Sequence, residues 1–528
     1  MASHSQFVEK ASAAEIERAA SDGPEAGAWT NDSKWETVKR HPIAMACCCY
    51  MLFTCIMWGY DGLASGVVLS LPQWRRGYGY LYHGQYVIAA KWQLAFTAVS
   101  MVGLVVGCAL TGLIANRWGQ KICIFVGHII TVGGVFCQWF SVGNMSMFLV
   151  GKLLTGVPLG VFVTTAPVYC AEVAPQRLRG IMVAAVNFSI VTGQVMGYGI
   201  MRETQKIMQG PNSYRILFAV QWGFAAVGLL FLYFIPESPT RLVARGKVEA
   251  ARRSIQTLYS PTTEVDQLIE QIRLNLTATA EESAGSVKDL FNRANRIRTL
   301  VAVSVFFIQA CSGISWILGY MGYFMQLGGL EGDLVFDISL GITGAMAVGN
   351  MASWLFVDRM GRRGLILSGL LFCTVSLVIN GALGCFPEKG RPVLLLQVSF
   401  MAVWGFMYQA SIGSVGYTLI AEVSTSSLRN LTQSLGTVVN VLPICIWSFA
   451  LPYMVNPDQA QMGGKVAFVF FGILVVCDVF VFFFYPETKG RTFEEIDELY
   501  AREIPARRFA KTDLGPQFLR RRNGEEKV

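Results

Sequence analysis

The feature that most constrains this chain is a series of long apolar blocks separated by short polar stretches. About 20 apolar residues with few charges form a helix long enough to cross a bilayer. Only 15% of the 528 residues are charged, against about 25% in soluble domains. Twelve such blocks lie near 43–70, 92–115, 122–142, 146–170, 181–201, 215–235, 299–323, 335–357, 364–384, 393–420, 430–453 and 466–485. The sequence therefore predicts an all-α polytopic membrane protein with twelve transmembrane helices.

The polar stretches divide the twelve blocks into two groups of six. Residues 1–42 are polar and mixed in charge, which is typical of a disordered tail. Residues 236–298 alternate charged and apolar positions at helical spacing, which predicts short amphipathic helices in a linker. The expected organisation is a tail at 1–42, a lobe at 43–235, a linker at 236–298, a second lobe at 299–485 and a tail at 486–528.

The distribution of Lys and Arg predicts the orientation of the chain. The loops after the second and eighth blocks carry Arg117, Lys121, Arg359 and Arg363, and both the linker and the C-terminal tail are also basic. The loops on the opposite side hold fewer basic residues. Because short loops rich in Lys and Arg stay in the cytoplasm, we expect both termini to be cytoplasmic.

Two motifs occur once in each half of the chain. Glu172 and Arg179 follow the fourth block, and Glu422 and Arg429 follow the tenth, with the same spacing of seven residues, or two helical turns. A second motif follows the second and eighth blocks, at 116–121 and 358–363. Such a repeat indicates two parallel six-helix halves related by an axis along the membrane normal.

The charged residues of these motifs suit a latch at the inner ends of the helices. Arg guanidinium groups bind carboxylates with two hydrogen bonds. We expect such pairs to form across the two lobes, to hold the cytoplasmic side shut while the cavity opens outward, and to break in the other state. The alternative is that the Arg residues only fix the topology. The residues expected to form this cytoplasmic gate are Arg117, Glu172, Arg179, Glu237, Asp358, Arg359, Arg362, Glu422, Arg429 and Glu487.

With these motifs on both halves, the chain resembles the sugar-porter family of the major facilitator superfamily. Two further signatures support this, PESP at 236–239 and PETKGRT at 486–492. Within the family the chain is most similar to fungal α-glucoside (maltose-type) permeases, on the stretches 90–93, 156–162, 186–187, 219–222, 452–457 and 463–465. The resemblance covers about 43–508 and implies the major facilitator fold, with two pseudo-symmetric six-helix lobes.

An ionisable side chain inside a membrane span costs free energy, so a residue of this kind is a candidate for a functional role. Asp61 lies within the first block and Lys152 within the fourth. The resemblance implies that Asp61 takes and releases the coupled proton, with Lys152 as its cationic partner. The alternative is a static pair that joins the two spans. Asp478, in the twelfth block, is a third such residue and has no assigned role.

Sugars are bound by amides, which pair with hydroxyl groups, and by aromatic rings, which cover the apolar sugar face. The resemblance implies the following sugar-binding residues: Asn187, Gln309, Trp316, Tyr408, Tyr417 and Asn440. The chain departs from the family pattern nearby. Ala310 stands where the family has a second Gln, and Gly413–Ser414 stands where relatives have Gly–Pro. These changes remove hydrogen-bonding groups and alter a helix break.

The leading functional hypothesis is transport of a sugar, an α-glucoside, disaccharide or related polyol, by proton symport and alternating access. A proton-antiport exporter of a specialised metabolite and a non-transporting nutrient sensor are the alternatives. An enzyme is not expected, because no nucleophile–base pair, metal cluster or phosphate loop stands out. We expect no cofactor, metal or nucleic acid, and as partners a sugar-like molecule, protons and the lipid bilayer. The family resemblance implies a monomer in the plasma membrane.

Overall fold

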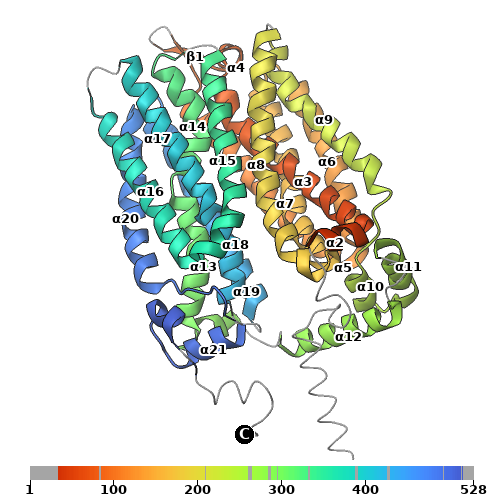
Figure 1. Cartoon of the computed structure of the whole chain (residues 1–528). Coiled ribbons are helices and arrows are strands. Elements are labelled where there is room, and N and C mark those ends of the chain that lie inside the picture. The colour runs from red at the N-terminus through yellow and green to blue at the C-terminus, as the bar shows by residue number, and fades with distance from the viewer. Residues whose placement is uncertain are drawn as a thin grey trace, which may run out of the picture. The chain divides into compact units, whose positions relative to one another are not determined.

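The computed structural model describes residues 34–512 and residue 514 (Figure 1), with gaps at 83–84, 208–209, 260–263, 283–286, 294, 331–332, 387–389, 425–427 and 492. The chain forms two compact units, residues Met1–Ala284 and Gly285–Val528. We refer to the spans of the first unit as lobe 1 and to those of the second as lobe 2.

Lobe 1 is an antiparallel bundle that follows a short N-terminal helix, α2 (Lys34–Arg40). Its six spans are α3 (Pro42–Val67), α5 (Ala90–Trp118), α6 (Gln120–Trp139), α7 (Met145–Val173), α8 (Gln176–Ile207) and α9 (Asn212–Leu232). The loop between α3 and α5 holds the turn η1 (Val68–Ser70), α4 (Pro72–Tyr78) and an antiparallel hairpin of β1 (Tyr80–Tyr82) and β2 (Gln85–Val87). Three further helices follow α9: α10 (Pro239–Ala244), α11 (Val248–Leu258) and α12 (Val265–Glu282).

Lobe 2 repeats this order of spans, but two of its spans are interrupted. It begins after the turn η2 (Val287–Phe291). The helices are α13 (Arg296–Cys311), α14 (Ile314–Leu327), α15 (Asp333–Met360), α16 (Arg362–Leu383), α17 (Arg391–Ala410), α18 (Ile412–Val423), α19 (Arg429–Val455) and, after the turn η4 (Gly463–Lys465), α20 (Val466–Phe484). The chain continues into α21 (Phe493–Ala501) and η5 (Ala506–Lys511).

The prediction of twelve spans is confirmed. Within the described residues, twelve helical segments are long and apolar enough to cross a membrane, and each overlaps one predicted block. The seventh span consists of α13 and α14 together, and the tenth consists of α17 and α18. The equivalent spans of lobe 1, α3 and α7, are each one continuous helix, although Pro158 and Pro167 lie inside α7.

Small residues let the helices of lobe 1 approach closely. A Cβ atom added at Gly107 of α5 would lie 2.0 Å from the Val157 carbonyl oxygen of α7, and one at Gly160 would lie 2.1 Å from the Leu104 carbonyl oxygen. No larger side chain fits at either position without moving a backbone. Gly in spans commonly serves this close helix packing, because lipid offers no hydrophobic drive for helices to associate.

Two small apolar clusters form outside the spans. Helices α10, α11 and α12 bury Val243, Ile255 and Leu268 against one another. After α20, the side chains of Leu499, Phe509 and Leu514 form a second cluster. Arg491 donates to the backbone carbonyls of Phe509 (3.0 Å) and Thr512 (2.6 Å), which fixes η5 beside the start of α21. The basic segment after the last span is therefore folded at least as far as residue 514.

Candidate functional site

The interior of lobe 1 holds an ion pair that is completely buried. Asp61 of α3 and Lys152 of α7 are both 0% exposed. The Lys152 Nζ atom donates to Asp61 Oδ1 at 2.9 Å. Gln221 of α9 donates its Nε2 to the same oxygen at 2.7 Å. Three different spans thus meet at one carboxylate.

The surroundings of Lys152 are largely apolar. Its ammonium group lies 5.4 Å from the ring centroid of Phe218, also of α9. A charge in such surroundings is stable only while its partner carries the opposite charge, because desolvation of each ion costs several kcal/mol. Loss of the negative charge on Asp61 would therefore remove the ion pair that joins α3 to α7. This coupling of a proton to helix contacts is the chemistry that the arrangement can perform.

Sequence reasoning identified Asp61 and Lys152 but gave no role to Gln221. The structure shows these three side chains together, and Gln221 is 0% exposed. The available signal was weak, since Gln221 is a single amide within the apolar helix α9. An amide buried in a span must bond to another span or to its own backbone, and only the fold reveals which.

Polar residues inside lobe 2 lie near the interruption between α17 and α18. Gln309 of α13 donates its Nε2 to the carbonyl oxygen of Ile412 at 2.6 Å. Tyr408 stacks on Trp404, with ring centroids 4.9 Å apart and an interplanar angle of 10°. Asn440 of α19 donates its Nδ2 to the Phe306 carbonyl oxygen at 3.0 Å, one turn before Gln309 on α13.

The remaining predicted sugar-binding residues are Trp316, Asn187 and Tyr417. Trp316 of α14 is 1% exposed, and within the described part of the chain its indole Nε1 has no hydrogen-bond partner. Asn187 is half-buried on α8 of lobe 1. The side chain of Tyr417 lies outside the described residues. Asp478 of α20 accepts a hydrogen bond of 2.6 Å from Thr374 of α16 at its Oδ2 atom.

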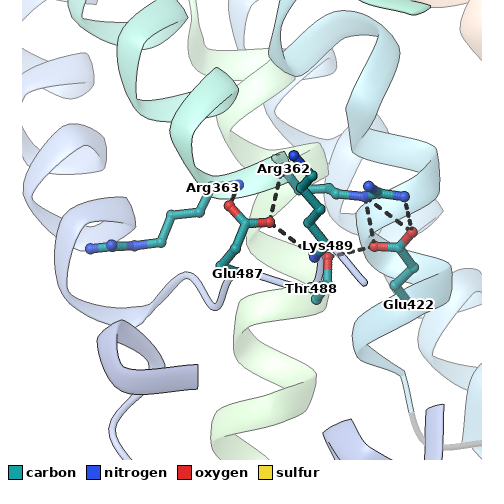
Figure 2. Close-up of polar contacts among 6 residues, drawn as sticks. All are labelled: Arg362, Arg363, Glu422, Glu487, Thr488 and Lys489. Carbon is teal, nitrogen blue, oxygen red and sulfur yellow. Dashed lines mark hydrogen bonds and ion pairs between the residues drawn. The ribbon is translucent and has the colours of Figure 1, made fainter. Parts of the chain in front are cut away.

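At the loop end of lobe 2, six residues form a polar cluster that we call the lobe 2 cluster (Figure 2): Arg362, Arg363, Glu422, Glu487, Thr488 and Lys489. Arg362 grips Glu422 through Nη2 at 2.9 Å and Nε at 3.2 Å. Thr488 donates to the second oxygen of Glu422 at 2.5 Å. Glu487 accepts from the backbone N–H groups of Arg362 (2.9 Å) and Arg363 (3.2 Å), so its carboxylate caps the first turn of α16.

Lobe 1 contains a polar cluster at the equivalent positions, which we call the lobe 1 cluster: Gln120, Lys121, Glu172 and Glu237. Glu237 accepts from the backbone N–H groups of Gln120 (2.8 Å) and Lys121 (3.3 Å), as Glu487 does at α16. The residue before each capped turn is a glycine with positive φ, 120° at Gly119 and 78° at Gly361. Gln120 donates its Nε2 to Glu172 at 3.2 Å. The neutral Gln120 thus stands where lobe 2 has Arg362.

Five further residues were predicted to belong to the gate, and the structure describes the side chains of three of them. Arg117 is exposed and lies over the Trp118 ring at 5.2 Å. Arg359 is exposed, and its carbonyl oxygen accepts from Lys489 Nζ at 3.0 Å. Arg179 is half-buried. The side chains of Asp358 and Arg429 lie outside the described residues. In the part of the chain that the structure describes, no group of three or more His, Cys, Asp or Glu side chains could hold a metal ion.

Comparison with known proteins agrees with the fold. A family model described as sugar (and other) transporter matches residues 47–500. The general α-glucoside permease of Saccharomyces cerevisiae is 31% identical over 476 residues, which cover 88% of this chain and 76% of the permease. The MFS transporter fmqE of Aspergillus fumigatus is 29% identical over 494 residues, 90% of each chain.

Among solved structures, the xylose transporter XylE from E. coli, in a partially occluded inward-open conformation, superposes with a TM-score of 0.70 at 20% identity. The match covers 85% of this chain and 100% of XylE. A likeness at this identity shows a common fold, which is that of the major facilitator superfamily. The matched proteins are transporters and not enzymes. The chain therefore belongs to the sugar (and other) transporter family.

Proposed function

We propose that this protein takes up an α-glucoside sugar together with protons, by alternating access. The single observation that carries proton coupling is the completely buried Asp61–Lys152 pair, bonded at 2.9 Å. The support for the substrate class comes from the α-glucoside permease, which is 31% identical over most of both chains. A structural relative of the same fold is described as a proton:xylose symporter.

In the proposed cycle, Asp61 carries the proton. While Asp61 is ionised, its Oδ1 atom holds Lys152 and Gln221, so that α3, α7 and α9 stay together. When a proton neutralises the carboxylate, Lys152 keeps its charge and loses its counter-ion. A buried, unpaired ammonium is strongly unfavourable, so lobe 1 then favours a conformation that gives Lys152 another partner or water. Release of the proton on the other side restores the pair.

Sugar recognition is assigned mainly to the aromatic residues of lobe 2. Tyr408, which stacks on the fully buried Trp404, provides an aromatic ring of the kind that covers a pyranose. The indole N–H of Trp316 is a buried donor without a protein partner among the described residues, so a sugar hydroxyl would satisfy it. Asn187, Gln309, Tyr417 and Asn440 complete the proposed set of contacts.

The proposed orientation places the two clusters and both termini in the cytoplasm, since these loops are the basic ones. We assign the protein to the plasma membrane as a monomer. The gate would consist of the clusters together with Arg117, Arg179, Asp358, Arg359 and Arg429.

Uptake of labelled maltose into liposomes, with and without an inward proton gradient, tests this proposal. One pH unit is worth about 1.4 kcal/mol per proton, or about tenfold accumulation at one proton per sugar. We expect accumulation by the wild type and none by Asp61→Asn. The matched control is Asp478→Asn, which removes a carboxyl from another span but keeps an acceptor for Thr374.

Accumulation kept in Asp61→Asn would reject Asp61 as the coupling residue. Equal loss in Asp478→Asn would show that any carboxyl in a span is needed, and so would remove the special role of the pair. No uptake of maltose by folded wild-type protein would contradict the proposed substrate class.

A separate test uses Asn187→Ala, which we expect to weaken sugar affinity about tenfold through one lost hydrogen-bonding group, with unchanged expression.

A further inference from the structure

Lobe 2 carries an open groove between the first half of α13 and the first half of α19. The groove has a volume of about 490 Å³. Its walls are formed mainly by six apolar side chains, Phe291, Ile297, Leu300, Val303, Leu435 and Val439. Thr299 and Arg296 complete the lining, and Arg296 is the only charged residue in it. The groove therefore combines a long apolar wall with a single positive charge.

The two helices that line the groove are in close contact with each other. A Cβ atom added at Gly436 of α19 would lie 2.7 Å from a ring carbon of Phe306 on α13, so a larger side chain does not fit there. One turn further along α19, Asn440 donates its Nδ2 to the Phe306 carbonyl oxygen at 3.0 Å. The groove is thus a depression along a tightly packed pair of helices, and it belongs to lobe 2 alone.

The exposed side chains beside the groove indicate that it faces lipid. On α13, Ile297 and Leu300 are exposed. On α19, Val438 and Leu442 are exposed one turn apart, whereas the exposed polar residue Thr437 points about 100° away from Val438 around the helix. In a membrane span, polar side chains face the bundle interior or water, and the remaining apolar surface is left to lipid. The groove lies on this apolar side of both helices.

The groove runs from the membrane surface into one leaflet of the bilayer. Arg296 is the first residue of the seventh span. Val303, further along α13, lies about 10 Å deeper, at 1.5 Å per residue. The hydrocarbon core of a bilayer is about 30 Å thick, so each leaflet contributes about half of that thickness. The charged end of the groove therefore lies at the level of lipid headgroups, and its apolar part lies at the level of acyl chains.

The positive charge at the mouth of the groove lacks a counter-ion from the protein. Within the described part of the chain, neither Arg296 nor the nearby exposed Arg293 forms an ion pair. Asp289, the nearest acidic residue along the chain, accepts a hydrogen bond of 2.9 Å from Asn292. A guanidinium binds phosphate oxygens with two parallel hydrogen bonds. A headgroup with net negative charge suits two arginines better than a zwitterionic one, whose cationic group they repel.

We infer that this groove binds one anionic phospholipid, from the leaflet that lies on the side of the two clusters. The phosphate binds Arg296, and one acyl chain fills the groove between Leu300 and Val439. Because the chain contacts both α13 and α19, the bound lipid stabilises the helix pair that carries Gln309 and Asn440 on its other side. The inference concerns lipid binding and does not depend on the proposed function.

Native mass spectrometry of the full-length protein in detergent tests the headgroup. The protein is titrated with phosphatidylserine or with phosphatidylcholine of the same acyl chains. We expect the first phosphatidylserine to bind at least about fivefold more tightly than phosphatidylcholine, the usual effect of one basic residue at an anionic membrane surface. Arg296→Gln should reduce this preference to less than about twofold.

The matched control for the headgroup is Arg502→Gln. Arg502 is also exposed and belongs to the same unit, but it pairs with Glu498 at 2.6 Å and does not line the groove. Both substitutions remove one positive charge, so they weaken any non-specific attraction to anionic lipid equally. Arg502→Gln should keep the wild-type preference for phosphatidylserine.

Leu300→Trp tests whether the acyl chain lies in the groove. The larger side chain occupies the groove, so we expect binding of both lipids to weaken by about tenfold through lost apolar contacts. Leu371→Trp is the control, because Leu371 is an exposed leucine of α16 outside the groove. Hydrogen–deuterium exchange of the wild type locates the site without any variant. Phosphatidylserine should slow exchange at 295–303 severalfold more than phosphatidylcholine does. This measurement decides the location if Leu300→Trp does not fold.

Four results overturn the inference. Equal binding of the two lipids by the wild type, or a preference that survives in Arg296→Gln, removes the assigned headgroup contact. Unchanged binding in folded Leu300→Trp, or unchanged exchange at 295–303 on addition of phosphatidylserine, removes the groove as the site. Equal protection of 295–303 by soluble glycerophosphate would make Arg296 a site for free phosphate. A wild-type dimer that Leu300→Trp converts to a monomer would make the groove a contact between two copies of the chain.

Discussion

The two lobes repeat the same order of helices but place their charges differently. Lobe 1 buries an ion pair, Asp61–Lys152, deep among its helices and has the neutral Gln120 in its cluster. Lobe 2 has the ion pair Arg362–Glu422 in its cluster, and its predicted sugar-binding residues are amides and aromatic rings. Along α7, Lys152 and Glu172 are about 30 Å apart, at 1.5 Å per residue.

The difference between the two pairs lies in their access to water. The side chains of Arg362 and Glu422 are each 19% exposed, so water can solvate them when they separate. The side chains of Asp61 and Lys152 are at most 1% exposed, so their separation leaves two bare charges unless a proton neutralises the carboxylate. Under the proposed function, the same kind of ion pair would act as a latch in lobe 2 and as a proton-sensitive contact in lobe 1.

The largest expected effect comes from breaking the buried pair. Lys152→Met should destabilise the protein by about 3–5 kcal/mol, because Asp61 is left as an uncompensated buried charge. The double variant Asp61→Asn/Lys152→Met should recover most of that stability, since neither charge remains. Thermal unfolding in detergent measures both. A double variant no more stable than Lys152→Met would show that packing around Lys152, and not its charge, holds lobe 1 together.

A smaller effect is expected when Arg362 of the lobe 2 cluster is replaced by glutamine, the neutral residue that lobe 1 has at the equivalent position. Arg362→Gln should destabilise the protein by about 1–3 kcal/mol, because Glu422 exchanges the charge-assisted bonds of Arg362 for at most one neutral amide bond, like that of Gln120 to Glu172, and otherwise keeps the Thr488 hydrogen bond. Turnover should fall about tenfold if the pair is a latch. Arg363→Gln is the control, because the Arg363 guanidinium donates to the Phe482 carbonyl oxygen and, among the described residues, to no carboxylate. Equal losses in both variants would reject a particular role for the Arg362–Glu422 pair.

The smallest effect is expected from the reverse exchange. Gln120→Arg gives lobe 1 the guanidinium of lobe 2, at a position where Gln120 already reaches Glu172 at 3.2 Å. We expect a gain of stability of no more than about 1 kcal/mol, as for partly exposed ion pairs. A lower turnover without a change in sugar affinity would sharpen the comparison, because it would show that a stronger lobe 1 cluster slows the cycle. A destabilised Gln120→Arg would mean that the two clusters are not equivalent.

The sequence predicted the parts of the fold that depend on long patterns. Twelve apolar blocks were sufficient to predict the twelve spans, since an apolar block of this length rarely forms anything other than a transmembrane helix. The repeated motifs at 116–121 and 358–363 predicted equivalent structures in the two halves, and the structure shows a capped turn at each motif. The latch was expected to pair charges across the two lobes, whereas the side-chain contacts described at these motifs lie within one lobe. The sequence alone shows that Gln120 occupies the position that Arg362 has in the second motif. It does not show that Gln120 bonds to Glu172.

The details that depend on contacts between distant segments could not be predicted. Gln221 and Gln309 are each a single amide in an apolar helix. Nothing in the local sequence indicates that Gln221 bonds to a carboxylate and Gln309 to a backbone carbonyl of another helix. The hairpin of β1 and β2 is too short to leave a clear alternating pattern. The folding of the segment after α20 depends on Arg491, whose role as a donor to two carbonyl oxygens appears only in three dimensions.

The central claim is that the buried pair of lobe 1 couples sugar to protons, and simultaneous measurement of both fluxes tests it most directly. Liposomes containing the protein would be given maltose without a pH gradient, while sugar entry and external pH are recorded together. The account predicts that wild-type protein moves protons inward in a fixed ratio to maltose. It predicts that Asp61→Asn exchanges labelled for unlabelled maltose across the membrane with no proton movement. Proton entry that follows maltose in Asp61→Asn as it does in the wild type would contradict the account.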